Sequence, residues 1–455
     1  MISYYSTNRH APQVALDQAL LQGQAPDRGL YMPTHIPPIA TEVRKTMHRM
    51  SYPDLAVRLL SPYAQGVFSD DELGDICHDA YNFDVPVEHV CDNRHLLRLD
   101  RGPTASFKDF AARFMGRALG RLVARQGREL LILTATSGDT GSAVAHAFSG
   151  VPNIRVLVLF PIDEVSDRQR KQMTTLGGNV ATVAVDGKFD DCQALVKRAF
   201  SDADLQGLNL SSANSINIGR LLPQSVYYAY AAAQVADVAS GEPVVVCIPS
   251  GNFGNLMGGM LARQSGLPVA RFIAATNIND EVPRFLASGQ YQKIEPSLAA
   301  ISNAMNVGHP SNLARLVDLY GGHIDERGAM LQQPDMQRLR EVVFAISIDD
   351  AQTRQTIRDV YATHNALLEP HGAVGWAGLD AFLNTEEGAA FHKTACVSLE
   401  TAHPAKFPDE IVALLGISPD LPSSLQGLEE LPESYGNMST DYAAFKALLQ
   451  REYAG

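Results

Sequence analysis

The sequence predicts an α/β protein with doubly wound parallel sheets in two domains, preceded by a helix-rich N-terminal domain. Short apolar runs alternate with longer amphipathic stretches from about residue 96 onward, as in βαβ units with helices on both faces of a sheet. Glycine-containing turns follow several of these runs. The chain has 455 residues, more than one hydrophobic core usually supports, so two or three packed units are expected.

The chain divides into three parts. Residues 1–95 form a separate N-terminal domain in this interpretation, because prolines interrupt short helical stretches there and no strand is followed by a glycine turn. Residues 96–415 hold the alternating runs, which are LLILTAT with GSAVAHAF, IRVLVLF with SDRQRKQMTTL, VATVAV with FDDCQALVKRAF, VVVCIP with NLMGGMLARQ, and ARFIAAT. The tail 416–455 is rich in proline and serine and ends in TDYAAFKALLQREY, which predicts a linker and a helix packed on the core.

Composition and charge narrow the classes of function. The chain carries 37 Lys and Arg against 50 Asp and Glu, a net charge of −13, which repels nucleic acid and anionic membranes. Its five cysteines have no CxxC spacing and its histidines no metal-ligand spacing, so neither a disulfide framework nor a metal site is predicted. No export signal and no apolar run of about 18 residues is visible, so we expect a soluble cytoplasmic protein.

The turn IPSGNFGN at 248–255 predicts an anion-binding loop between a strand and a helix. Gly251 and Gly254 permit backbone conformations that leave successive N–H groups in one concavity, and the helix N-terminus adds partial positive charge. A tight turn that uses glycine only for steric reasons is the alternative. Neither GxxxxGK[ST] nor a helix-opening GxGxxG occurs, so no nucleotide triphosphate or dinucleotide site is predicted.

A second turn, TATSGDTGSA at 134–143, also follows an apolar run and precedes a helix. Thr136, Ser137, Asp139 and Thr140 place hydroxyls and backbone donors where a carboxylate can bind, and the helix N-terminus favours negative charge. Ordinary helix capping uses the same residue types and explains the turn equally well when it is taken alone.

Two further stretches contain candidate catalytic side chains. In GPTASFKDF at 102–110, Lys108 follows small residues and an aromatic. A lysine in a partly apolar site loses its proton near neutral pH, as a Schiff-base lysine requires, although most lysines are solvated surface groups. In SLETAHPAKF at 398–407, Thr401 offers a hydroxyl to the ring nitrogen of a cofactor, and His403 is interpreted as a structural hydrogen-bonding residue.

Taken together, FKDF, TSGDTG, PSGNFGN and ETAHPAKF resemble the threonine synthase family in order and rough spacing. DGKFDDCQALVKRAF, NSINIGRLLPQSVYY and EPHGAVG are also similar, so the resemblance covers nearly the whole chain. It implies the fold of fold-type II pyridoxal-phosphate enzymes, similar to the tryptophan synthase β subunit, with a smaller α/β subdomain at about 125–205. Asp27, Arg28 and Gly29 depart from the family's N-terminal pattern, in which a second glycine is more usual.

The resemblance also implies roles for single residues. Lys108 would carry pyridoxal 5′-phosphate as a Schiff base, and Thr401 would face the pyridine nitrogen without holding it protonated, because a hydroxyl is neutral. The residues implied for the cofactor phosphate are Gly251, Asn252, Phe253, Gly254 and Asn255. Those implied for the substrate are Thr136, Ser137, Asp139 and Thr140 at its carboxylate and Asn214, Ser215, Asn217 and Arg220 at its phosphate.

The implied reaction converts O-phospho-L-homoserine and water to L-threonine and phosphate by γ-elimination and β-addition, in a monomer or homodimer. A phospholyase that yields a keto acid, ammonia and phosphate shares the lysine, the phosphate loop and the elimination steps, so it stays an alternative. A dehydratase acting on an unphosphorylated hydroxy amino acid fits the full-length motifs less well. A non-catalytic metabolite-binding protein is disfavoured because Lys108 and the phosphate loop are both intact.

Overall fold

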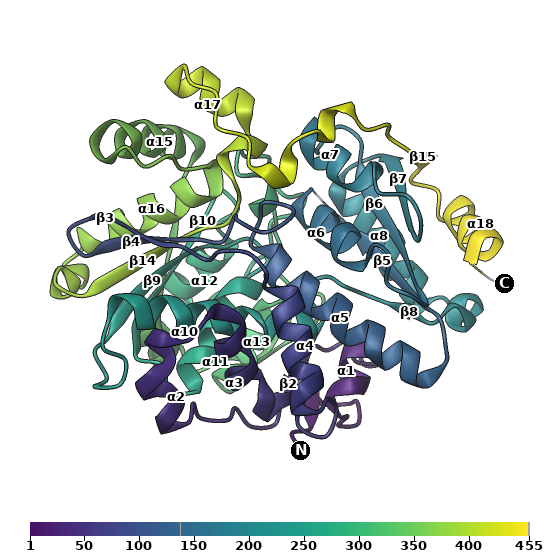
Figure 1. Ribbon diagram of the computed structural model, residues 1–455, viewed down its shortest axis with the longest axis horizontal. Helices are drawn as coiled ribbons and strands as arrows, with labels where there is room; N and C mark the ends of the chain where they lie inside the picture. Colours follow the sequence, from purple (N-terminus) through teal and green to yellow (C-terminus); the bar gives the residue numbers. More distant parts are fainter. Residues whose placement is uncertain (137, 454–455) are drawn as a thin grey trace.

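The computed structural model describes residues 1–136 and 138–453, and its framework consists of two largely parallel sheets (Figure 1). The larger sheet has the strand order β13-β10-β9-β14-β4-β3, and the smaller has the order β15-β7-β6-β5-β8. Within these two sheets every pairing is parallel except that of β3 with β4. The architecture confirms the predicted α/β class with two parallel sheets.

The larger sheet is covered on both faces. In β9, Val244 and Val246 join the core beneath α10 and α11, whereas Val245 and Cys247 pack against α16 on the opposite face. This alternation follows from the two-residue repeat of a strand. The strands are β3 (Val87–Cys91), β4 (Arg94–Arg98), β9 (Val244–Pro249), β10 (Val269–Thr276), β13 (Val343–Ser347) and β14 (Ala395–Glu400). The helices around it are α9 (Ile218–Leu221), α10 (Gln224–Val235), α11 (Gly254–Gln264), α12 (Glu281–Ser288), α13 (Leu313–Leu319), α14 (Met336–Val342), α15 (Asp350–His364) and α16 (Pro370–Leu383).

The smaller sheet is built in the same way. In β5, Leu130 and Ile132 face the core under α5 and α6, and Leu131 and Leu133 face α8 and α18. Its strands are β5 (Leu130–Ala135), β6 (Ile154–Pro161), β7 (Val180–Asp186), β8 (Leu210–Ser211) and β15 (Gly436–Ser439). Its helices are α5 (Lys108–Gln126), α6 (Asp139–Phe148), α7 (Asp167–Thr174), α8 (Phe189–Ser201) and α18 (Tyr442–Tyr453).

The N-terminal residues form helices and a short antiparallel strand pair at the bottom of Figure 1. Their elements are β1 (Tyr4–Ser6), α1 (Leu16–Gln22), β2 (Tyr31–Pro33), α2 (Thr41–Thr46), α3 (Tyr52–Ala64) and α4 (Asp70–Ala80). Helices α3 and α4 pack on α10 and α5. Strand β3 lies before the boundary expected at residue 95 and β4 spans it, and both belong to the larger sheet.

The departure from the family pattern at Arg28 lies in a tight turn. Arg28 has φ 67°, a left-handed conformation in which glycine is the least strained residue. The carboxylate of Asp27 stabilises the turn by accepting the backbone N–H groups of His10 at 2.9 Å and Ala11 at 2.8 Å. Arg28 therefore occupies a backbone conformation in which a glycine would be less strained.

The C-terminal tail connects the two sheets. After α17 (Pro408–Leu415) the chain crosses the top of Figure 1, adds β15 beside β7 in parallel, and ends in α18. The sequence predicted a linker and a helix here but not the strand, because GNMS contains no apolar run. A second short antiparallel pair, β11 (His323–Ile324) with β12 (Met330–Gln332), lies outside both sheets. None of the described helices is long and apolar enough to cross a membrane.

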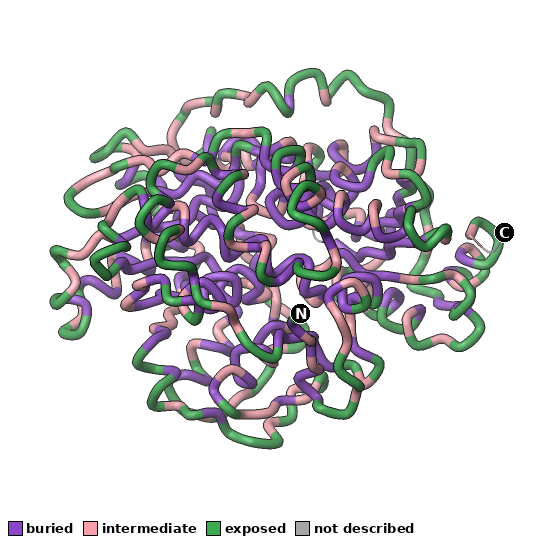
Figure 2. Tube along the Cα trace, turned by 60° about the horizontal axis from the view of Figure 1, so that its bottom comes forward, coloured by how far each residue is buried: buried purple, intermediate pink, exposed green. Residues whose placement is uncertain are grey.

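The ends of the strands bring the predicted motifs together. The loops after β5, β9 and β14 leave the sheets at their carboxyl ends, where doubly wound folds bind ligands. The chain before α5 reaches the loop after β14, because Ser106 and Ala402 form an antiparallel bridge. Ser106 and Ala402 are both buried, so this junction lies in the interior, and Figure 2 shows buried segments running through the middle of the molecule.

Candidate active site

Lys108 is the first residue of α5 and is half-buried. The backbone N–H of Phe107 donates to the carbonyl of Thr401 at 2.9 Å, which places the lysine beside the loop after β14. Burial lowers the pKa of Lys108 to about 8, although the negative charge of Asp139 opposes the shift. A lysine that is partly deprotonated near neutral pH is suited to attack a carbonyl carbon and to transfer protons.

The loop between β9 and α11 has the geometry of an anion cradle. Gly251 packs directly against the backbone of Met305: a Cβ atom on residue 251 would lie 2.8 Å from the Cα of Met305. Phe253 has φ 58° and precedes the first residue of α11. Within the described part of the chain, the N–H groups of residues 251–253 donate to no acceptor. Free donors in front of a helix N-terminus favour a phosphate.

Two asparagine side chains complete this loop. Asn252 is held in place on both sides, since its Nδ2 donates to Ser215 Oγ at 2.6 Å and its Oδ1 accepts the N–H of Ser311 at 2.6 Å. Asn255 Oδ1 accepts the hydroxyl of Tyr228 at 2.7 Å, while its buried Nδ2 has no partner among the described residues. An unpartnered buried donor next to free N–H groups fits the acceptor-rich phosphate of pyridoxal phosphate.

In the turn after β5, one side-chain hydroxyl stabilises the turn itself through hydrogen bonds to the backbone. Thr136 Oγ1 accepts the backbone N–H groups of Gly138 at 2.9 Å and Gly141 at 2.8 Å. Thr140 is half-buried in the first turn of α6, and Ser137 lies outside the described residues. The N-terminus of α6 points into the junction of the two sheets, so binding of a substrate carboxylate there stays a prediction.

Asp139 takes part in a buried ion pair. Lys406 Nζ lies 2.6 Å from Asp139 Oδ1, and Gln169 Nε2 donates to the same oxygen at 3.0 Å. Both charged side chains are buried. Burial alone raises the pKa of Asp139, but the charges of Lys406 and Lys108 outweigh it and hold the pKa below its usual range. The pair links the loop after β14 to the smaller sheet, and it occupies one of the oxygens that the sequence assigns to substrate.

The predicted substrate-phosphate residues lie around α9. Asn214 is half-buried, and its Oδ1 has no partner among the described residues. Asn217 caps α9 and donates to the carbonyl of Leu20 at 2.9 Å, so its amide supports the helix. Arg220 is buried and donates to the carbonyl of Ala213 at 2.6 Å, and burial lowers its pKa to about 10. It therefore remains a cation near neutral pH.

Thr401 lies just beyond β14 and is buried. Its hydroxyl oxygen is 3.5 Å from Oε1 of Glu369, the residue that caps α16. The next carboxyl group is that of Glu400, whose Oε1 accepts the backbone N–H of Glu369 at 2.8 Å. Burial, together with the nearby charge of Glu369, raises the pKa of Glu400 well above its ordinary value. Two buried carboxyl groups, those of Glu369 and Glu400, thus lie next to Thr401.

Sequence reasoning missed Lys406, Glu369 and Gln169 as parts of this site. Lys406 and Glu369 lie inside ETAHPAKF and EPHGAVG, which were used only to support the resemblance. Gln169 lies on a polar helix with no special spacing. His403 has the structural role that was expected, since its Nδ1 accepts the N–H of Ala405 at 3.1 Å.

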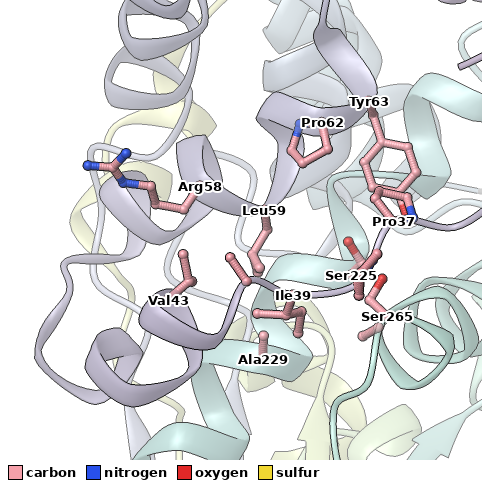
Figure 3. Close-up of a pocket in the computed structure, with 13 residues that line it drawn as sticks. Pro37, Ile39, Val43, Arg58, Leu59, Pro62, Tyr63, Ser225, Ala229 and Ser265 are labelled. Carbon is pink, nitrogen blue, oxygen red and sulfur yellow. The ribbon is translucent and has the colours of Figure 1, made fainter. Parts of the chain in front are cut away.

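An apolar cavity lies apart from this site (Figure 3). It is formed between the segment after β2, helix α3 and helices α10 and α11, and none of the predicted site residues lines it. Labelled lining residues include Ile39, Leu59, Tyr63, Ser225 and Ala229. The active-site candidates are therefore the loops at the sheet ends and not this cavity.

Protein-family comparisons match nearly the whole chain. Residues 88–397 match the family described as "Pyridoxal-phosphate dependent enzyme". Residues 3–81 match "Threonine synthase N terminus", and residues 372–449 match "Threonine synthase, C-terminal". The chain belongs to the threonine synthase family. Membership confirms the expected cofactor class and makes the protein a pyridoxal-phosphate-dependent lyase.

The chain is similar to threonine synthases of known sequence and structure over nearly its full length. The threonine synthase of Escherichia coli is 41% identical, with 98% of each chain covered, and that of Haemophilus influenzae is 39% identical, with 98% and 99% covered. The structure of pyridoxal-phosphate-bound threonine synthase from Brucella melitensis has a TM-score of 0.92 at 32% identity and covers 100% of both chains. Yeast threonine synthase has a TM-score of 0.89 at 29% identity, with 99% of each chain covered. The fold-type II architecture and the threonine synthase function are thereby confirmed.

Proposed function

We propose that the protein converts O-phospho-L-homoserine and water to L-threonine and inorganic phosphate, with pyridoxal 5′-phosphate held on Lys108. The position of Lys108 carries the proposal: it is half-buried at a helix N-terminus beside Thr401, with a pKa of about 8. The loop from Gly251 to Asn255 supplies the donors for the cofactor phosphate. Full-length likeness to threonine synthases supports the choice of reaction.

The cofactor and Lys108 have different roles in this reaction. When bound, pyridoxal phosphate withdraws electrons from the carbon atoms of the amino acid and so makes their protons acidic. Lys108 Nζ removes and returns these protons at the α and β carbons, which requires a pKa near the working pH. Phosphate leaves the γ carbon, which takes up a proton and becomes the methyl group, and the hydroxyl of water replaces one proton on the β carbon. The proton lost from the β carbon and the proton left over from water account for the proton gained by the γ carbon and the one carried by the released phosphate, so the atoms balance.

Substrate binding requires positive potential, because the substrate is an anion and the protein has a net charge of −13. Arg220 supplies a buried cation, and its Nε has no partner among the described residues. Asn214 and Ser215 lie on the same segment, and Ser215 also touches the phosphate loop through Asn252. The N-terminus of α6 offers its N–H groups to the substrate carboxylate.

The experiment that tests this proposal records an absorbance spectrum and then measures products in the same sample. We expect a cofactor absorption band, and after addition of O-phospho-L-homoserine we expect phosphate and threonine in equal amounts. Lys108→Ala removes both the covalently held band and turnover, because no other amine lies at that position. Lys393→Ala changes an exposed lysine outside the site and serves as the matched control.

Other outcomes each contradict a part of the proposal. Phosphate with a keto acid and ammonia would assign the protein to the phospholyases. Release of ammonia from unphosphorylated threonine, with no reaction of the phosphorylated substrate, would indicate a dehydratase. A protein that takes up no pyridoxal phosphate would contradict the role of Lys108.

A further inference from the structure

The inner face of helix α7 contacts several loops of the candidate site. Gln169 is fully buried; its Nε2 donates to Asp139 Oδ1 at 3.0 Å, and its Oε1 accepts Asn303 Nδ2 at 3.3 Å. Three residues later on the same face, Gln172 Nε2 donates to the carbonyl of Thr104 at 3.0 Å. Helix α7 therefore touches the turn after β5, the loop at residue 303 and the segment that leads into α5.

The helix itself is short and polar. Its sequence, DRQRKQMT, has one large apolar side chain, and an isolated helix of this length is not stable in water. Gln169 also forms the capping box of the helix, because its Oε1 accepts the N–H of Ser166 at 3.1 Å. Any movement of α7 thus moves Gln169 relative to the site, and the position of α7 depends on its neighbours.

The outer face of α7 is held by the C-terminal tail, which passes beside it between α17 and β15 (Figure 1). The carboxylate of Glu433 accepts Arg170 Nε at 2.9 Å and Arg170 Nη2 at 3.1 Å, and it also accepts the hydroxyl of Thr174 at 2.9 Å. The side chains of Arg170 and Glu433 are each 20% exposed. A bidentate pair of this kind fixes both distance and orientation.

Glu429 makes a second connection between the tail and α7. Its carboxylate lies 3.2 Å from Arg168 Nη2 and 3.5 Å from Lys171 Nζ, and its backbone carbonyl accepts Lys171 Nζ at 2.6 Å. Arg168 also donates to the carbonyl of Ala405, which precedes Lys406 in the loop after β14. The two carboxylates of the tail thus engage the basic side chains of α7.

We propose that Glu429 and Glu433 are positioning residues for substrate binding. By holding α7 from outside, they keep Gln169, and through it the turn after β5, in the arrangement that takes the substrate carboxylate. This inference rests on the proposed function, in which the N-terminus of α6 binds that carboxylate. Asp139 is the first residue of α6, and Gln169 and Lys406 together fix its side chain.

The expected consequence is a loss of substrate affinity. When α7 is loosened, the binding arrangement is populated for only a fraction of the time, and the apparent dissociation constant rises by the inverse of that fraction. Turnover of bound substrate and affinity for the cofactor should change little, because the hydrogen bonds of α7 described above involve neither Lys108 nor residues 251–255. A merely structural role would instead lower the fraction of folded protein, and so lower kcat with KM unchanged.

Steady-state kinetics of the holoenzyme with O-phospho-L-homoserine test the proposal. For Glu433→Ala we expect KM to rise about fivefold and kcat to stay within about twofold, since a bidentate, largely buried pair contributes more than an exposed one. Glu433→Gln keeps an acceptor for Thr174 and should have an intermediate KM. Glu429→Ala should raise KM as well. Should Glu433→Ala not fold, Glu433→Gln decides.

Glu430→Ala is the matched control. It removes the same charge from the same segment, but the side chain of Glu430 is exposed and forms no ion pair or hydrogen bond with the described residues. Its KM should equal that of the wild-type protein.

The route through Gln169 has its own test. Gln169→Met should raise KM, and on that background Glu433→Ala should have a smaller further effect, because the connecting amide is missing. Hydrogen exchange of the holoenzyme gives a readout that does not depend on turnover. In Glu433→Ala we expect faster exchange in α7 and at Gly138 and Gly141, whose N–H groups donate to Thr136 Oγ1, with α11 unchanged.

The proposal is overturned if Glu433→Ala and Glu429→Ala have the KM of the wild-type protein, or if kcat falls while KM stays the same. Unchanged exchange at Gly138 and Gly141 in Glu433→Ala would also overturn it. A wild-type holoenzyme that forms no threonine would contradict the proposed reaction alone, and the exchange rates would then decide this inference separately.

Discussion

At the scale of single residues, Lys108 gives the cofactor-free protein a pH-dependent stability. Its pKa falls from 10.5 in the unfolded chain to about 8 in the folded one, chiefly through burial. Between these values the unfolded chain binds a proton that the folded protein has released, so rising pH favours folding in this window. Below pH 8 the buried ammonium group lowers the free energy of unfolding. Above pH 10.5 this destabilisation disappears, because the lysine is neutral in both the folded and the unfolded chain.

We therefore expect Lys108→Met to stabilise the cofactor-free protein below pH 8, with an advantage that fades as the pH rises through the window. Urea unfolding of both proteins at a series of pH values measures the difference. Other groups that titrate at high pH affect both proteins equally and cancel. An advantage that grows with pH would show that Lys108 is not held deprotonated by burial.

Among the residues of the site, we expect replacement of Lys406 to lower the free energy of unfolding the most. Lys406→Met leaves the carboxylate of Asp139 buried without its cation, and breaking a buried pair in this way costs about 3–5 kcal/mol. The double variant with Asp139→Asn should recover part of that free energy, because no uncompensated charge remains. Chemical denaturation measures the free energy of unfolding of the wild-type protein, of Lys406→Met and of the double variant. Lys45→Met, in an exposed ion pair with Glu42, should be close to wild type.

At the scale of elements, α18 and β15 close one edge of the smaller sheet. Phe445 of α18 is fully buried against the core that also holds Leu195 of α8. We expect Phe445→Ala to cost about 3–5 kcal/mol locally and to release α18 and β15 together. Hydrogen exchange should then increase in β15 and along the edge of β7, which pair through Gly436 and Val183.

Exchange in the larger sheet should stay unchanged in that variant, since α18 packs on α8 and on the segment 203–208 of the smaller unit. Gln450→Ala alters an exposed position of the same helix and should leave exchange in both sheets at wild-type rates. Faster exchange throughout the molecule would mean that the tail is part of one cooperative unit with both sheets.

At the scale of the whole molecule, the cofactor should stabilise the folded protein, because its site consists of loops from both sheets and does not exist in the unfolded chain. A ligand present at a hundredfold excess over its dissociation constant stabilises the native state by about 2.7 kcal/mol. We expect pyridoxal phosphate to raise the unfolding temperature of the wild-type protein strongly and that of Lys108→Ala less, since the phosphate loop remains. Pyridoxal without phosphate should act weakly on both. Equal effects of the two compounds would contradict the assignment of the loop at Gly251.

Much of the site was predictable because its residues lie in short motifs. Lys108 and the loop from Gly251 to Asn255 depend on neighbours in the chain, and the apolar runs alternate with the period of strands covered by helices. Strand β15 was not predictable, since GNMS has no apolar pattern and pairs with β7 only after the tail has crossed the molecule. Its strand state depends on a partner that is distant in sequence.

The sequence by itself determined the fold class and the family motifs, and it predicted the cofactor lysine and the phosphate loop. Only the tertiary structure decided which charges meet. It paired Asp139 with Lys406, and it placed the carboxylate of Glu369 behind Thr401. Local patterns encode backbone conformation and burial, whereas the protonation of a buried group depends on the charges and donors that other segments bring within a few ångströms of it.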